Sequence, residues 1–285
     1  MKLRHARGHL ELDRCLVMGI VNRTPDSFYD GGRMAFEESV AFAEVLVEEG
    51  ADLLDLGAVK AGPGADVSLE EEAARLLPLV EAVVGRVDVP VSVETSHPEL
   101  ARRALDVGAA IINDVRGLVE RGLAELAAET GAALVLMHTG GQVRGRPRHP
   151  RYGDVVAEVK RDWASMVRRA EELGVVRDQL IVDPGLDFGK TTYHSLEILR
   201  RLEELVAFGF PLLVAPSRKD VVGETLDLPL EDRLEGTLAI VAISVTAGAH
   251  IVRVHDVRSA ARTVAMTEAI AGRRAPARPL RGLWD

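Results

Sequence analysis

The sequence predicts an α/β fold, a single (β/α)8 barrel of the TIM-barrel type, and three observations support this prediction. Short apolar runs alternate with longer amphipathic segments along the whole chain of 285 residues. Aromatic residues make up only 4%, and the abundant small and aliphatic residues suit parallel strands covered by helices. No linker-like stretch divides the chain. We therefore expect one domain over 1–285, with a core at about 15–271, a short N-terminal segment and an Arg/Pro-rich tail.

The strand-like runs number eight, and a helical pattern follows each of them. In chain order they are CLVMGIVN (15–22), ADLLDLG (51–57), VPVSVET (89–95), AAIINDV (109–115), AALVLMH (132–138), QLIVDPG (179–185), PLLVAPS (211–217) and IVRVHDV (251–257). This count and this alternation favour a closed barrel over an open doubly wound sheet.

Amphipathic patterns predict helices between these runs, for example over 36–50 and 68–84. Ser68, followed three residues later by Glu71, predicts a capping box at the start of the second helix. The segment GTLAIVAISVTAGA (236–249) is apolar nearly all round. Such a helix is suited to burial in an interface or between two layers of the fold, and the sequence leaves both possibilities open.

Glycine stands directly before several of the strand-like runs. Gly50, Gly108 and Gly131 each follow a helical pattern and precede a small or apolar residue that opens a strand. A glycine at this point can take the left-handed conformation that ends many helices, so we expect these three residues to be helix C-caps.

Composition excludes several classes of protein. A net charge of −9 argues against nucleic acid as the main partner, which requires a broad basic face. No stretch approaches the roughly 20 apolar residues of a membrane-spanning helix. Cys15 is the only cysteine, which excludes a disulfide framework and a thiolate metal cluster. The N-terminus lacks the apolar run of a secretory signal, so we expect a cytoplasmic protein without a membrane partner.

Polar residues collect at the carboxyl ends of the predicted strands, where the βα loops of a barrel form its active site. A single carboxylate or amide at such a position can equally be the N-cap of the following helix. Nine positions around one rim favour a functional site. They are Asn22, Asp55, Glu94, Asn113, His138, Asp183, Lys219, Arg253 and His255.

The last strand and its neighbour carry cations. Arg253 and His255 are two residues apart and therefore share a face of the strand. Ser217, Arg218 and Lys219 follow the preceding strand. Barrels often bind phosphate after their last two strands, and arginine and lysine are natural partners for it. The alternative is a salt-bridge cluster that closes the barrel.

Two further groups of residues suggest ligand chemistry. Asn113, Asp183 and Lys219 offer an amide, a carboxylate and an ammonium, which together can bind a flat heterocycle with donors and acceptors. A carboxylate can accept two parallel hydrogen bonds from an aminopyrimidinone edge. The loop 22–32 is long and rich in turn residues, as lids and binding loops commonly are. Asn22 at its start could supply an oxygen ligand to Mg2+ bound with a diphosphate.

From about Met18 to Val257 the chain resembles the dihydropteroate synthase family. The matching strings are MGIVNRTPDSFYDGG, GADLLDLG with a following PGA, VPVSVET, GAAIINDV, LVLMH, VDPGLDFGKT, PLLVAPSRK, RLEGTLA and RVHDV. The resemblance implies a transferase that joins a hydroxymethyl-dihydropterin diphosphate to p-aminobenzoate with Mg2+ and releases diphosphate. It also implies a homodimer formed through helices of the barrel.

The resemblance assigns roles to individual residues. It implies a pterin subsite and a diphosphate subsite, with catalytic roles for Asp30, Lys219, Arg253 and His255. The pterin would be bound by Glu94, Asn113, Asp183 and Lys219, and the diphosphate by Asn22, Arg253 and His255, with Asn22 also at the metal. Glu94 stands where the family has an aspartate, so its charge is moved by one methylene. Lys190 matches a lysine of the family.

Several positions depart from the family pattern around the second substrate. Ala61 and Gly62 stand where the family has a threonine and an arginine in the second loop. Asp220 replaces a serine near the p-aminobenzoate carboxylate, where a negative charge should repel it unless Asp220 is paired or turned away. Arg23 and Asp187 add charges where small or apolar residues are usual.

These departures leave two functions open. The strings NRTPDSFYD, VKAGPG and KDVVGETL resemble a second, actinobacterial type of synthase homologue. The chain is therefore either a dihydropteroate synthase or a paralogue that binds pterin or pterin diphosphate with lost or changed arylamine condensation. A methyltetrahydrofolate-using methyltransferase is a third possibility. The first loop and the Ser-Arg-Lys and Arg-Val-His-Asp strings argue against it, because a methyl donor needs no diphosphate site.

Overall fold

The computed structural model describes residues 1–22, 36–59, 67–141 and 149–281. Among them, eight parallel strands form one sheet in the order β8-β7-β6-β5-β4-β3-β10-β9. Their bounds are β3 (Leu16–Asn22), β4 (Leu53–Gly57), β5 (Val91–Glu94), β6 (Ile111–Asp114), β7 (Ala133–Met137), β8 (Leu180–Asp183), β9 (Leu213–Val214) and β10 (Ile251–Val254). A parallel bridge between Val182 and Leu212 joins the two ends of the sheet. The eight predicted runs and the predicted α/β barrel are thus confirmed.

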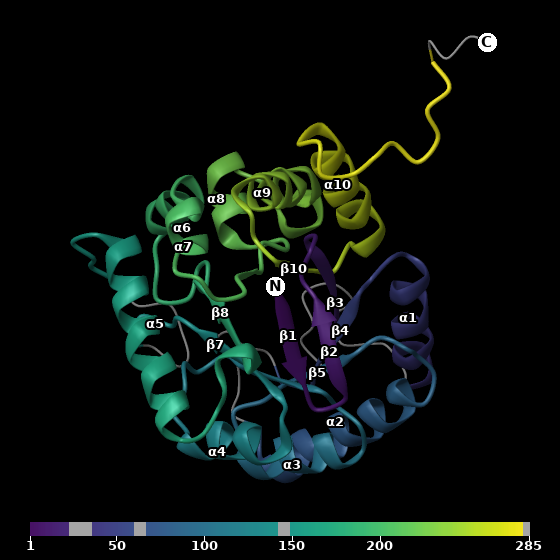
Figure 1. Ribbon diagram of the computed structural model, residues 1–285, viewed down its shortest axis with the longest axis vertical. Helices are drawn as coiled ribbons and strands as arrows, with labels where there is room; N and C mark the ends of the chain where they lie inside the picture. Colours follow the sequence, from purple (N-terminus) through teal and green to yellow (C-terminus); the bar gives the residue numbers. More distant parts are fainter. Residues whose placement is uncertain (23–35, 60–66, 142–148, 282–285) are drawn as a thin grey trace.

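Helices surround the strands as an outer ring (Figure 1). Their bounds are α1 (Phe36–Glu48), α2 (Leu69–Val84), α3 (Pro98–Asp106), α4 (Arg121–Thr130), α5 (Val155–Glu172), α6 (Thr192–Arg200), α7 (Leu202–Val206), α8 (Asp220–Leu226), α9 (Leu234–Ala247) and α10 (Val257–Ile270). Gly50, Gly108 and Gly131 have φ angles of +106°, +115° and +74°. Gly131 is the C-cap of α4, as predicted, whereas Gly108 follows the C-cap Val107 of α3 and Gly50 lies two residues beyond the end of α1. None of the helices in the described ranges has the length and apolarity to span a membrane.

A hairpin that the sequence did not predict closes the amino-terminal end of the barrel. It consists of β1 (Lys2–His5) and β2 (Gly8–Glu11), drawn in purple over the strands in Figure 1. Leu3 and Leu12 are buried in the apolar cluster that fills the barrel interior, and the Ala6 N–H donates to the Ala110 carbonyl at 3.2 Å. The opposite end, where the strands have their carboxyl termini, remains for the site.

Helix α9 is partly buried against the barrel, as its apolar sequence predicts. Ile240, Val241 and Val245 are buried in the layers between the helices and the sheet. Ile243, on another side of the same helix, is 52% exposed. Burial between layers therefore accounts for one side of α9 only.

The predicted capping box at α2 forms only in part. The Ser68 hydroxyl accepts a hydrogen bond from the Glu71 N–H at 3.2 Å, as predicted. The Glu71 carboxylate pairs with Arg75 one turn further along the helix. In a full capping box the Glu71 carboxylate would accept a hydrogen bond from the Ser68 N–H. Here the same carboxylate forms an ion pair with Arg75 instead.

Candidate functional site

The strand register places three of the predicted side chains at one level of the barrel. Asn22 of β3 is paired with Gly57 of β4, Gly57 with Glu94 of β5, and Glu94 with Asn113 of β6. A Cβ atom added to Gly57 would lie 3.1 Å from Asn22 Oδ1 and 3.9 Å from the carboxyl carbon of Glu94. The absent side chain of Gly57 therefore gives space to the Asn22 amide and the Glu94 carboxylate, a role that the sequence did not indicate.

Asp55 links two of the predicted subsites. Its Oδ2 accepts a hydrogen bond from Asn113 Nδ2 at 2.8 Å and another from Arg253 Nε at 2.7 Å. The Asp55 side chain is fully buried. The sequence placed Asp55 on the rim without a role, although a carboxylate within the apolar run Leu-Leu-Asp-Leu was a signal, because buried charges require partners.

Arg253 also forms an ion pair with Glu94. Its Nη2 donates to Glu94 Oε2 at 2.6 Å. Burial raises the pKa of Glu94 to about 7, although the neighbouring Arg253 acts to lower it. Arg253 therefore belongs to a salt-bridge cluster in the barrel, which the sequence had left open as the alternative to a phosphate site. The Arg253 side chain is 15% exposed, so the protein does not enclose it completely.

Asp183 and Lys219 lie close together beyond β8 and β9. Asp183 Oδ1 accepts the Gly185 N–H at 2.7 Å, and burial raises the pKa of Asp183 against the effect of the Lys219 charge. Lys219 Nζ donates to the Leu186 carbonyl at 2.7 Å and lies 4.9 Å from the centre of the Phe188 ring. Burial lowers the pKa of Lys219. The pair thus offers a carboxylate and an ammonium beside an aromatic face.

The loop after β8 lies directly against the end of β7. Gly185 and Gly189 have φ angles of +61° and +60°. A Cβ atom on Gly185 would lie 2.1 Å from the His138 carbonyl oxygen, and one on Gly189 would lie 2.2 Å from that of Thr139. Only glycine allows this approach, so the sequence Gly-Leu-Asp-Phe-Gly fixes where the loop lies.

Lys190 holds this loop in place through hydrogen bonds to backbone carbonyls. Its Nζ donates to the carbonyls of Gly185, Phe188 and His138 at 3.1, 2.9 and 3.1 Å, and lies 2.8 Å from His138 Nδ1. Burial lowers the pKa of Lys190 to about 7. Burial, followed by the Lys190 charge, also lowers the pKa of His138 to about 4, although Asp162 lies 3.2 Å from His138 Nε2. These contacts give Lys190 and His138 a positioning role.

Replacing Lys190 by methionine is expected to lower the free energy of unfolding by about 2–4 kcal/mol. Methionine keeps much of the volume but leaves carbonyls of the loop without their donor. Urea unfolding followed by circular dichroism measures the change. The exchange Lys2→Met is the control, because Lys2 forms an ion pair in which its side chain is 67% exposed. Equal midpoints for the two variants would contradict the role assigned to Lys190.

The basic side chains after β9 and β10 are in different environments. His255 Nδ1 lies 2.8 Å from Ser217 Oγ, which also accepts the His255 N–H at 3.1 Å. Arg218 donates through Nε and Nη2 to the two oxygens of Asp256, at 3.0 and 2.9 Å. Its Nη1 donates to the carbonyls of Leu230 and Glu231 at 3.2 and 3.0 Å. All three guanidinium nitrogens of Arg218 therefore bind within the protein, whereas the sequence had grouped it with phosphate ligands.

Two charges that depart from the family pattern have partners within the protein. Asp220 pairs with Arg233 at 3.1 Å. Asp187 accepts the Val221 N–H and the Ser195 hydroxyl, each at 3.1 Å. Because Asp220 is paired, its repulsion of a substrate carboxylate is reduced. Other residues named from the sequence lie outside the described residues: Arg23, Asp30, Ala61 and Gly62.

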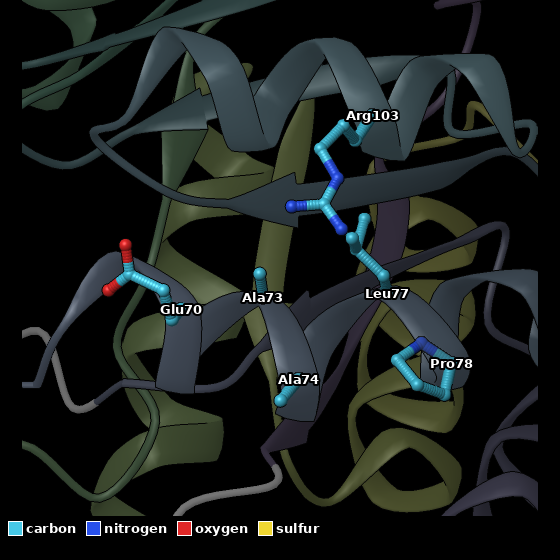
Figure 2. A pocket seen from close by; sticks show the side chains of 6 residues that line it. All are labelled: Glu70, Ala73, Ala74, Leu77, Pro78 and Arg103. Carbon is cyan, nitrogen blue, oxygen red and sulfur yellow. The ribbon is translucent and has the colours of Figure 1, made fainter.

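A separate pocket lies on the outside of the barrel. Figure 2 shows it between α2 and α3, lined by Glu70, Ala73, Ala74, Leu77, Pro78 and Arg103. None of these residues belongs to a strand end. Within the described ranges, no cluster of three or more histidine, cysteine, aspartate or glutamate side chains could hold a metal ion by itself.

Comparisons with known proteins agree with the resemblance seen in the sequence. The family model described as "Pterin binding enzyme" matches residues 18–255. "Inactive dihydropteroate synthase 2" of Mycobacterium leprae is 47% identical, with 95% of this chain and 96% of that protein covered. Dihydropteroate synthase of Escherichia coli K12 is 43% identical, with coverage of 94% and 96%. The structure of Xanthomonas albilineans dihydropteroate synthase with 4-aminobenzoic acid has a TM-score of 0.88 and 39% identity, covering 98% of this chain and all of that one.

Proposed function

Because the chain belongs to the dihydropteroate synthase family of pterin-binding enzymes, we propose that it is a transferase of folate biosynthesis. It joins 6-hydroxymethyl-7,8-dihydropterin diphosphate to p-aminobenzoate and releases diphosphate. The observation that carries this proposal is the network in which Asp55 binds both Asn113 and Arg253, since it joins an amide suited to a pterin to a cation suited to a diphosphate.

In this proposal the pterin ring lies between β5, β6 and β8. Asp183 accepts two hydrogen bonds from the aminopyrimidinone edge, while Asn113, Glu94 and Lys219 meet the remaining donors and acceptors. The buried positions of Asp183, Asn113 and Glu94 support this, because hydrogen bonds between buried polar groups exclude water and give specificity.

The diphosphate leaves from the same side of the barrel. Arg253, His255 and the Asn22 amide surround its place, and Asp30 of the first loop helps to assemble it. The C–O bond breaks and its electron pair leaves with the diphosphate, so the pterin methylene becomes positive. The arylamine nitrogen then forms a C–N bond to the methylene, and the proton that this nitrogen loses passes to solvent. Cations fixed beside the leaving oxygen stabilise the charge that develops there.

We propose Mg2+ as the cofactor, with Asn22 as its protein ligand. The donor set is compatible with magnesium, which commonly takes one or two protein oxygens together with phosphate oxygens and waters. Asn22 Oδ1 lies at the carboxyl end of β3, close to Gly57 and to the Glu94 carboxyl group. When bound, Mg2+ would neutralise part of the diphosphate charge.

A homodimer is proposed through the face that α9 and α10 share. These helices lie side by side on the outer ring (Figure 1), and Ile243, Met266 and Ile270 are 52, 61 and 76% exposed on them. Burying these side chains against a second copy would remove them from water. Sedimentation should give a dimer that the double variant Ile243→Glu, Ile270→Glu converts to monomer, and an unchanged dimer would contradict this face. The cytoplasmic location stays a prediction.

The second candidate is a paralogue that binds a pterin without condensing it. Its support is the Mycobacterium leprae relative, whose name calls it inactive, and the second-loop residues Ala61 and Gly62. The two functions are separated by measuring dihydropteroate formed from the pterin diphosphate and p-aminobenzoate with Mg2+. We expect product at an enzyme-like rate. A folded protein that binds the pterin diphosphate but gives no product would be the paralogue.

If no product forms, Ala61→Thr with Gly62→Arg tests whether the second loop is responsible. Asp220→Ser is added in a separate variant, because Asp220 pairs with Arg233 and its removal disturbs that contact. Activity gained from the loop pair would place the loss in the second loop. If neither variant gains activity and both remain folded, neither the second loop nor Asp220 is the cause of the lost activity.

A further inference from the structure

Arg253 is held along one edge by two carboxylates. Its Nε donates to Asp55 at 2.7 Å and its Nη2 to Glu94 at 2.6 Å. A guanidinium has five N–H groups, and the Nε–Nη2 edge is one of the two that can bind an anion with two parallel hydrogen bonds. In this chain the protein occupies that edge. Neither carboxylate binds Nη1, which leaves this group for a ligand.

The two carboxylates differ in how firmly they are fixed. Asp55 is fully buried and also binds Asn113, so its contact with Arg253 is part of a larger network. Glu94 lies at the end of β5, and among the described residues the hydrogen bond of its side chain is the one that it accepts from Arg253. Glu94 is therefore the partner whose change would free the guanidinium without disturbing the Asn113 amide.

Glu94 also lies beside the other ligand proposed for the diphosphate. The Asn22 amide oxygen and the Glu94 carboxyl carbon are both within 4 Å of the point where a Gly57 Cβ would lie. Glu94 thus lies near the Asn22 side chain and binds the Arg253 guanidinium. An anion that contacts both would have this carboxylate as a close neighbour, and like charges at such a distance repel each other.

We infer that Glu94 is a specificity-determining residue that weakens the diphosphate subsite relative to the pterin subsite. It does so by occupying Nη2 of Arg253 and by placing a negative charge beside Asn22. The inference rests on the proposed function and adds to it: within the same site, the Glu94 carboxylate limits how tightly the diphosphate is bound.

The test is titration calorimetry on the full chain with two separate probes. Sodium diphosphate with Mg2+ measures the anion subsite, and 6-hydroxymethylpterin measures the pterin subsite. Glu94→Gln removes the charge and keeps the shape. Glu94→Asp keeps the charge but shortens the side chain by about 1.5 Å, which takes the carboxylate beyond hydrogen-bonding distance of Nη2. Glu72→Gln is the matched control, because Glu72 is buried nearby and faces His97 at 3.8 Å.

We expect Glu94→Gln to bind diphosphate about tenfold more tightly than the wild type and Glu94→Asp about threefold more tightly. Neither variant should bind the pterin more tightly, and Glu72→Gln should stay within twofold of the wild type for diphosphate. Diphosphate affinity that is unchanged in both Glu94 variants, or raised equally in Glu72→Gln, would overturn the inference. A wild-type protein that does not bind the pterin would instead contradict the proposed function.

Discussion

Replacing Arg253 by methionine is expected to lower the free energy of unfolding by about 3–5 kcal/mol, the range found when one partner of a buried ion pair is removed. Asp55 and Glu94 are both buried and both bind this guanidinium. Without Arg253, two carboxylates would remain close together in the barrel with no cation between them. Urea unfolding at pH 8 measures the loss.

The effect should increase with pH, because the Glu94 charge that Arg253 compensates develops as the pH rises through its raised pKa. Burial raises its pKa from 4.5 to about 7, so the folded protein binds a proton that the unfolded chain releases near 4.5. A raised acid pKa means that stability falls as pH rises from about 4.5 to 7. Removing the Arg253 charge raises this pKa further and extends the fall to higher pH. The variant should therefore differ less from the wild type at pH 6 than at pH 8.

A triple variant separates charge from packing. Arg253→Met combined with Asp55→Asn and Glu94→Gln removes the uncompensated charges and should recover at least half of the lost stability. If the triple variant is no more stable than Arg253→Met alone, lost packing around the arginine stem explains the effect. If Arg253→Met alone is as stable as the wild type, the ion-pair network contributes nothing to the free energy of unfolding.

Replacing Asp183 by asparagine is expected to weaken pterin binding about 100-fold, which corresponds to about 2.7 kcal/mol. The exchange preserves the volume but turns one acceptor into a donor, and that donor would face a donor of the aminopyrimidinone edge. A buried polar group left without a partner costs this much in binding sites designed for hydrogen bonds. Calorimetry with 6-hydroxymethylpterin measures the change.

The fold should survive the Asp183→Asn exchange. The amide oxygen of asparagine can still accept the Gly185 N–H that Asp183 Oδ1 accepts at 2.7 Å. The exchange removes a charge near Lys219, but Lys219 keeps the Leu186 carbonyl as its acceptor and burial already raises the pKa of Asp183. The variant should unfold within about 1 kcal/mol of the wild type and bind diphosphate unchanged. Pterin affinity retained within threefold would exclude Asp183 from the pterin subsite.

The sequence predicted the strands well because each parallel strand is buried on both faces and reads as a continuous apolar run. It also placed polar residues such as Asn22, Glu94 and Asp183 correctly at strand ends, whereas Asp55 and Arg253 lie within β4 and β10. It missed the hairpin β1–β2, because Leu3 and Leu12 are isolated apolar residues among polar ones. Their burial comes from contact with the barrel interior, which a local pattern does not show.

The roles of Asp55 and Lys190 could not be predicted from the residues alone. Lys190 matched a lysine of the family, but its hydrogen bonds go to carbonyls of two segments that meet only in the folded barrel. Asp55 was one polar residue among nine on the rim. Its importance follows from a single oxygen that receives hydrogen bonds from β6 and β10.

The sequence by itself determined the number and order of the strands, the end of the barrel that carries the site and the family to which the chain is similar. These follow from local periodicity and from motifs a few residues long. Only the tertiary structure decided which charges meet. Arg253 is separated along the chain by 198 residues from Asp55 and by 159 from Glu94. Barrel closure places β10 beside β3, and these side chains then meet across the interior because contacts over such separations are set by strand register.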